Sequence, residues 1–166
     1  MTVVIHQTLC VQSDARPTFH DMTDDVARLV RETAVQNGIV IIYSQHTTCS
    51  VIIQEQSDDV NYYGTQLILQ DMVDGLAKLF PTCQTQGQYA HPGALHIQLA
   101  QRERGEEAWW SLNTDAHLRS VLLGRSQTVP IVDGQMTLGD FGRIYFADFD
   151  QVRGRQRTVR VQIMGE

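Results

Sequence analysis

Residues 127–164 have the sequence QTVPIVDGQMTLGDFGRIYFADFDQVRGRQRTVRVQIM, and this stretch indicates the fold class more strongly than any other part of the chain. Segments rich in β-branched and aromatic residues predict strands at 127–132, 143–149 and 158–164. A turn at Asp133-Gly134 follows the first of them. Strand therefore follows strand in this third of the chain, which favours an α+β fold with a mixed or antiparallel sheet over a doubly wound parallel sheet.

Upstream, strands and helices interleave. Strands are predicted at 3–11, 39–44 and 49–55, and the uniformly apolar 39–44 is expected to be buried on both faces. About three helices are expected from apolar spacing and capping residues. The first is expected to be capped by Thr23 and to end at Asn37-Gly38, the second to run from Asp58 or Asp59 to Leu79, and the third to follow Asn113 as far as Gly124. Residues 81–110 are polar and are expected to form a long functional or mobile loop.

Length and composition limit the class of protein. The 166 residues contain no repeat or low-complexity linker, so a single domain over 1–166 is expected. The 13 Lys and Arg against 19 Asp and Glu give a charge of -6 without a basic stripe, which argues against nucleic acid as a partner. No apolar run approaches the roughly 20 residues that span a bilayer, so no membrane partner is expected. Three cysteines in no metal-like spacing favour a reducing cytoplasm over a disulfide framework.

Histidines supply the first candidate site. His46 lies between two apolar strands, in a polar segment without the Gly, Asn or Pro typical of a turn. His91 lies in the long polar stretch. His117 follows Asn113 by four residues, so both are expected on one face at a helix start, where free N–H groups can also bind an anion. Three imidazoles and a carboxylate or water suit Zn²⁺ or a similar ion, although the spacing is not local and scattered surface histidines remain an alternative.

Charged residues supply the second candidate. Glu55 lies at the end of a predicted strand. It is either a carboxylate of the site or a solvated capping group. Arg153, Arg155 and Arg157 belong to the one cationic cluster of the sequence. Strand alternation places Arg155 and Arg157 on one face, which is either solvated or suited to holding a phosphate through a bidentate guanidinium.

The segment Gln45–Glu55 resembles the YjbQ family, small proteins also described as secondary thiamine-phosphate synthases. Further stretches agree with the family in order and approximate spacing: Tyr89–His91, Asp115–Leu118, Leu123–Ser126, Val129–Ile131, Gly134, Leu138, Gly139, Phe149, Asp150, Arg153, Arg155 and Gly165-Glu166. The resemblance covers the whole chain and implies a compact α+β protein, commonly a homotrimer, with a polar site near subunit boundaries. The family's site residues match His46, His91, His117, Glu55 and Asn113.

The resemblance implies a transferase that joins a pyrimidine pyrophosphate to a thiazole phosphate. A divalent metal, Zn²⁺ or Mg²⁺, is then expected on His46, His91 and His117, where it neutralises the departing pyrophosphate. Arg153 and Arg155 are expected to clamp the same oxygens, Arg153 in catalysis and Arg155 in binding. Glu55 is expected to orient a ligand or the metal, and Asn113 to bind substrate or water. Two alternatives stay open: a metal-dependent hydrolase of a small phosphate or amide, and a non-catalytic trimer that binds a metal or a phosphorylated ligand.

Overall fold

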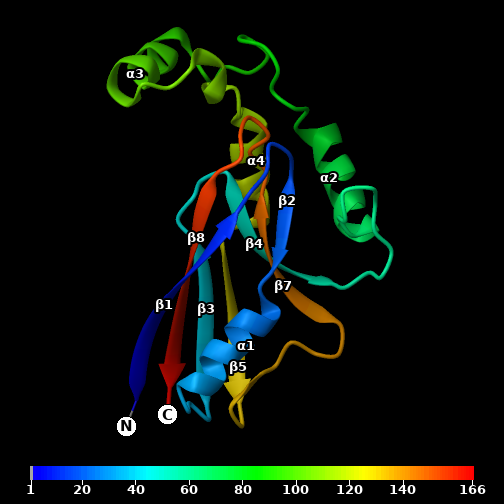
Figure 1. The fold of residues 1–166 in the computed structure, drawn as a ribbon, viewed down its shortest axis with the longest axis vertical. Coiled ribbons are helices and arrows are strands. Elements are labelled where there is room, and N and C mark those ends of the chain that lie inside the picture. The colour runs from blue at the N-terminus through cyan, green and yellow to red at the C-terminus, as the bar shows by residue number, and fades with distance from the viewer. Residues whose placement is uncertain (1) are drawn as a thin grey trace.

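Two antiparallel β-sheets form the body of the molecule in the computed structural model, which describes residues 2–166 (Figure 1). The larger sheet has the strand order β1 (Val3–Gln12), β8 (Gln156–Gly165), β3 (Gly38–Ser44), β5 (Ser126–Val132) and β6 (Gln135–Met136). The smaller sheet has the order β2 (Thr18–Asp21), β7 (Gly142–Asp148) and β4 (Cys49–Glu55). Every strand pair is antiparallel. The predicted α+β single domain is confirmed, with antiparallel sheets.

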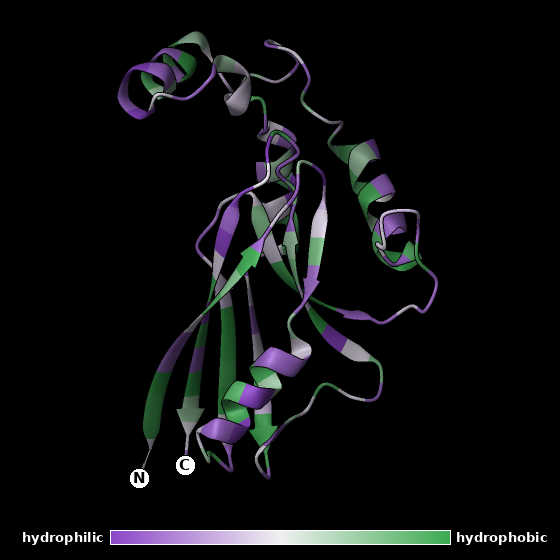
Figure 2. Cartoon of the chain, in the orientation of Figure 1, coloured by the Kyte–Doolittle hydropathy of each residue, from purple (hydrophilic) through white to green (hydrophobic). Residues whose placement is uncertain are grey.

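The inner faces of the two sheets share one apolar core. In β8 the period of two buries Val159, Val161 and Ile163, and β7 supplies Ile144 and Phe146 from the other sheet. Helix α1 (Thr23–Glu32) closes this core with the apolar side chains Val26, Leu29 and Val30. Figure 2 shows hydrophobic residues along β3 and in the N-terminal part of β1.

The expectation that residues 39–44 are buried on both faces is wrong. Val40 and Ile42 are fully buried, whereas Ile39 and Ile41 are half-buried and Tyr43 is exposed. Alternate residues of β3 therefore point into the core and out of the larger sheet. Because both faces of the strand carry apolar residues, the sequence pattern did not distinguish them.

The boundaries of α1 also differ from expectation. Met22 is its N-cap, and the Thr23 hydroxyl accepts the Ile144 N–H at 2.8 Å instead of capping the helix. The helix ends at Glu32 with Thr33 as C-cap, and Ala34 then takes a left-handed φ of 57°. The chain thus turns before it reaches Asn37.

Helices α2 (Leu67–Leu79) and α4 (Thr114–Leu123) pack on the outer face of the smaller sheet. Helix α2 begins well after Asp58, because Asn61 directs a local turn: its side-chain carbonyl accepts the N–H groups of Tyr63 and Thr65. Gly64 within this turn has a φ of 79°. Helix α4 has the predicted extent, with Asn113 as N-cap residue but without a capping bond from its side chain.

The polar stretch 81–110 is not one long loop. It contains helix α3 (Ala94–Arg104) and the 3₁₀ helix η1 (Ala108–Ser111), so residues 2–166 form four α-helices instead of about three. We call residues 94–111 the arm. In α3 only Ile97 and Ala100 are buried, which explains why apolar spacing did not predict it. Figure 1 shows α3 beyond one end of the sheets, where it packs mainly against η1.

Within residues 2–166, none of the helices combines the length and the apolar character needed to cross a membrane.

Candidate functional site

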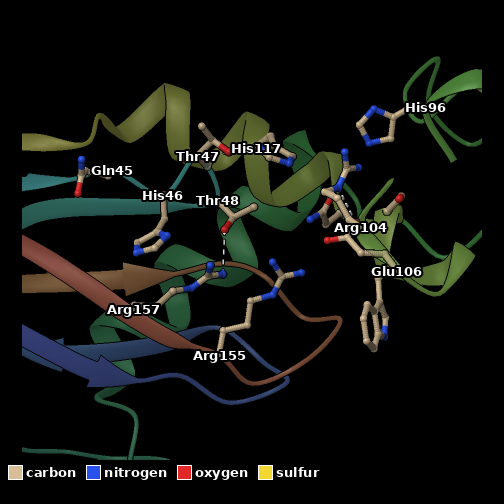
Figure 3. A pocket seen from close by; sticks show the side chains of 13 residues that line it. Gln45, His46, Thr47, Thr48, His96, Arg104, Glu106, His117, Arg155 and Arg157 are labelled. Carbon is tan, nitrogen blue, oxygen red and sulfur yellow. Dashed lines mark hydrogen bonds and ion pairs between the residues drawn. The ribbon is translucent and has the colours of Figure 1, made fainter. Parts of the chain in front are cut away.

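A polar cavity of about 380 Å³ lies between the sheet body and the arm (Figure 3). One wall comes from the β3–β4 turn, the residues at the start of β8, and the start of α4, and the other wall comes from the arm. The lining residues are Gln45, His46, Thr47, Thr48, Asn113, His117, Arg155 and Arg157 from the body, and His96, Arg104, Glu106, Trp110 and Ser111 from the arm. Four predicted site residues, His46, Asn113, His117 and Arg155, therefore share one cavity.

His46 is fixed by the turn that follows β3. Its backbone N–H donates to the Ser44 hydroxyl at 3.2 Å, and its carbonyl accepts the Cys49 N–H at 3.2 Å. The ring Nε2 accepts the backbone N–H of Thr158 at 3.0 Å. Burial lowers the pKa of His46, and the guanidiniums of Arg157 and Arg155 lower it further, so the ring is neutral near pH 7.

His117 lies in the first turn of α4, where its Nδ1 is 3.1 Å from the carbonyl oxygen of Thr47. Burial is the main cause of its lowered pKa, and the bond to Thr47 opposes that shift. The ring of His91 lies 6.2 Å from that of His117 and 4.6 Å from that of His96, measured between centroids. These three imidazoles therefore form a cluster at the base of the arm.

His96 is the histidine that sequence reasoning missed. It lies in the first turn of α3, inside the stretch predicted to be a loop, and it lines the cavity. Its only sequence signal was its position five residues after His91.

The predicted metal ligands do not form a metal centre within one chain. Across residues 2–166, no three or more His, Cys, Asp or Glu side chains are arranged to hold a metal ion. His46 fits ligation poorly, because its Nε2 lone pair is occupied by the Thr158 N–H and the neutral ring then carries its proton on Nδ1. Metal dependence stays a prediction.

Two buried carboxylates hold the guanidiniums of the cavity. Asp148 and Asp150 are both 0 % exposed. Arg157 Nε lies 2.6 Å from Asp148 Oδ2 and its Nη2 lies 3.2 Å from Asp148 Oδ1, a bidentate pair, while Nη2 also donates to the Thr48 hydroxyl at 3.1 Å. Arg155 Nη2 lies 3.2 Å from Asp150 Oδ2. Arg157 thus has little freedom of orientation, and Arg155 is positioned by one ion pair with Asp150.

Arg157 was not predicted as a site residue. The alternation that places it on the same face as Val159 and Val161 was a usable signal, because those valines are core residues. Of the two alternatives for this face, the solvated one is therefore wrong: it is the inner face of the sheet, and Arg157 is only 5 % exposed.

Three predicted site residues, His91, Arg153 and Glu55, do not line the cavity. The Arg153 guanidinium carbon lies 3.4 Å from the ring centroid of Trp110, and its Nη2 lies 3.7 Å from Glu106 Oε1, so Arg153 fastens the arm to the body. Glu55 is exposed at the far end of β4, about 20 Å along the strand from Cys49. Within its own chain, Glu55 does not reach the cavity.

The cavity lining is rich in hydrogen-bond donors. Three arginines line it against one carboxylate, Glu106, and that carboxylate already accepts a bond from Arg104 at 3.3 Å. In Figure 3 the side chains of Arg155 and Arg157 lie between His46 on one side and Glu106 on the other. This arrangement can bind an anionic group of a small molecule.

Comparison with known proteins identifies the family. A family model described as UPF0047 protein YjbQ-like matches residues 7–166. A UPF0047 protein of Archaeoglobus fulgidus is 32% identical over 152 residues, which cover 92% of this chain and 97% of that protein. A crystal structure of a YjbQ/UPF0047 protein from Clostridium acetobutylicum superposes with a TM-score of 0.69 at 28% identity, over 96% of this chain and 98% of that one. A YbjQ-like protein of unknown function from Sulfolobus solfataricus, 19% identical and fully covered, shares the fold with a TM-score of 0.75. The chain belongs to the YjbQ/UPF0047 family.

Proposed function

We propose that the chain is an enzyme that binds a small phosphorylated molecule in the cavity between the sheet body and the arm. The observation that carries the proposal is the pair of guanidiniums, Arg155 and Arg157, oriented by the buried carboxylates Asp150 and Asp148. Guanidiniums fixed in this way bind phosphate oxygens without the cost of ordering a flexible side chain. Arg104 and the helix start at Asn113 line the same cavity and favour negative charge as well.

The reaction we propose is the one that the YjbQ resemblance implies, the joining of a pyrimidine pyrophosphate to a thiazole phosphate. Negative charge grows on the departing pyrophosphate, and preorganised donors that stabilise such charge are a large source of rate enhancement. Arg155 and Arg157 are suited to this role. A divalent metal remains a proposed addition, for which His91 and His117 are the nearest pair among the predicted ligands.

The test is a product assay on the purified chain with both substrates, in Mg²⁺, Zn²⁺, Mn²⁺ and a chelator, with His117→Ala as control. We expect thiamine phosphate to form at least about 10-fold faster with the native chain than with the variant. Phosphate release without a joined product would replace the proposal with a hydrolase. Stoichiometric binding of pyrophosphate without turnover would replace it with a binding protein, and no difference from the control would exclude this cavity as the site.

We also propose that the chain assembles as a homotrimer through the outer face of the larger sheet. The strand register places Val4, Met164 and Ile39 in one row across this face, and Val4 is 52% exposed. A second cavity of about 620 Å³ opens on the same face beside Ile41 and Tyr43. An apolar sheet face with a hollow of this size suits a copy of the same chain.

Light scattering is expected to give about three times the 18.8 kDa mass of one chain. Val4→Glu is expected to shift this mass toward that of the monomer, because it places a charge in the proposed contact. Val121→Glu is the matched control, since Val121 is 75% exposed on α4 and does not belong to the sheet face. A native mass of one chain, or equal effects of both variants, would contradict the trimer.

The cytoplasm is the compartment we propose. Cys10, Cys49 and Cys83 are free thiols, as expected for a chain kept reduced. Cys49 is fully buried, and burial raises its pKa, so it is a packing residue and not a nucleophile.

A further inference from the structure

We infer that His46 and His117 offer a ligand opposite hydrogen-bonding groups, an N–H donor from His46 and a nitrogen lone pair from His117. The inference rests on the proposed function, because it narrows the class of phosphorylated molecule that the cavity takes. It follows from bonds whose polarity is fixed by the backbone: an amide N–H can only donate, and a carbonyl oxygen can only accept.

His46 is the donor. Its Nε2 lies 3.0 Å from the Thr158 backbone nitrogen, so Nε2 must supply the lone pair and the proton of the neutral ring resides on Nδ1. The hydroxyl of Thr158 lies 3.3 Å from the same Nε2 and can also donate to it, so this second contact is compatible with Nε2 as the acceptor. The nitrogen left for a ligand is therefore Nδ1–H.

His117 is the acceptor. Its Nδ1 lies 3.1 Å from the Thr47 carbonyl oxygen, so Nδ1 carries the proton. The nitrogen left for a ligand is Nε2, with its lone pair free. Both rings thus hold the proton on Nδ1, but the backbone engages Nε2 in His46 and Nδ1 in His117, so the nitrogen that remains for a ligand differs between them.

The two rings flank one turn, because Thr47 directly follows His46 in the chain. His46 lines the same cavity as Arg157 and Arg155, so its N–H belongs to the anion-binding end of the cavity. His117 lies against the imidazoles of the arm base. The chemistry points to a phosphate or pyrophosphate ester that carries a hydroxyl or N–H group a few bonds from the phosphorus.

Nitrogen-15 NMR of histidine-labelled protein tests the ring assignment without any ligand. Two-bond ¹H–¹⁵N correlations at pH 7.5, with a chelator present, are expected to place the proton on Nδ1 in both rings. His46→Gln and His117→Gln assign the signals by their loss. A proton on Nε2 of either ring would overturn the inference.

Binding of two matched probes, glycerol 3-phosphate and propyl phosphate, tests the ligand class. We expect the hydroxyl-bearing probe to bind the native chain about 2- to 10-fold more tightly, as one added hydrogen bond to His117 allows. His117→Asn retains a donor to Thr47 but has no group at the Nε2 position, so the preference should vanish. His117→Gln places an amide oxygen near that position, so the preference should persist.

The outcomes separate the two proposals. Equal binding of both probes by the native chain would overturn the ligand class inferred here and leave the anion site intact. If neither phosphate binds while NMR finds both protons on Nδ1, the proposed function is overturned and the opposite polarity of the two rings is supported.

Discussion

Replacement of Arg157 by leucine is expected to lower the free energy of unfolding by about 3–5 kcal/mol. Arg157 is the bidentate partner of Asp148, and both side chains are buried. Its Nη2 also lies 3.5 Å from Asp150 Oδ2. The leucine side chain leaves the charge of Asp148 buried without a partner. The free energy needed to keep an unpaired carboxylate away from water is larger than the net stabilisation that the ion pair itself provides.

Urea unfolding, followed by circular dichroism, measures the change. Arg31→Leu is the matched control: Arg31 is exposed on α1, away from the buried pair and from the proposed trimer face. The control is expected to cost less than about 1 kcal/mol. Arg157→Lys should fall between the two, because it keeps the charge and loses the second bond. Equal losses for the two leucine variants would refute the role given to the buried pair.

Arg155→Met is expected to weaken the binding of pyrophosphate by about 10- to 100-fold. Arg155 lines the cavity, and its side chain is 27% exposed, so its guanidinium is accessible to a ligand while Asp150 holds it in place. Asp150 keeps Arg157 as a cationic neighbour in the variant, so the fold is expected to survive. The loss of the charge-assisted contact between Arg155 and pyrophosphate is then expected to change the binding affinity and not the free energy of unfolding.

Calorimetric titration with pyrophosphate at constant ionic strength measures this loss. Arg31→Met removes the same charge from an exposed position on α1, so it separates a local contact from a change in net charge. The control is expected to bind within about twofold of the native chain. A comparable loss in both variants would place pyrophosphate outside this cavity.

The long strands and the fold class were predictable because long β-branched runs have few alternatives to a sheet. The short strands β2 and β6 were not predicted. The start of α2 was not predictable from the sequence. The side chain of Asn61 accepts hydrogen bonds from nearby backbone N–H groups, and this local turn replaces a helix in residues whose pattern is otherwise typical of a helix. The arm was not predictable from apolar spacing either, because α3 buries only Ile97 and Ala100.

For the site, the sequence predicted which residues interrupt helices and strands. It did not predict which of these residues meet at the same end of the sheet body. His46 and Asn113 meet because a turn and a helix start lie at the same end of the body. Glu55 follows the same turn by only a few residues, but β4 carries it away from the cavity. The partner of His46 Nε2, the amide of Thr158, lies 112 positions along the chain, and no local pattern indicates it.

The two walls of the cavity differ in how they are held. The sheet wall is tied to the core through Asp148 and Arg157, whereas the arm meets the body largely through the stack of Arg153 on Trp110 and the ion pair with Glu106. We therefore expect substitutions in the arm to leave the Asp148–Arg157 pair of the sheet wall in place. Proteins with this fold can therefore differ in the molecule that they bind through changes in the arm alone, while the buried charge pair of the sheet wall stays the same.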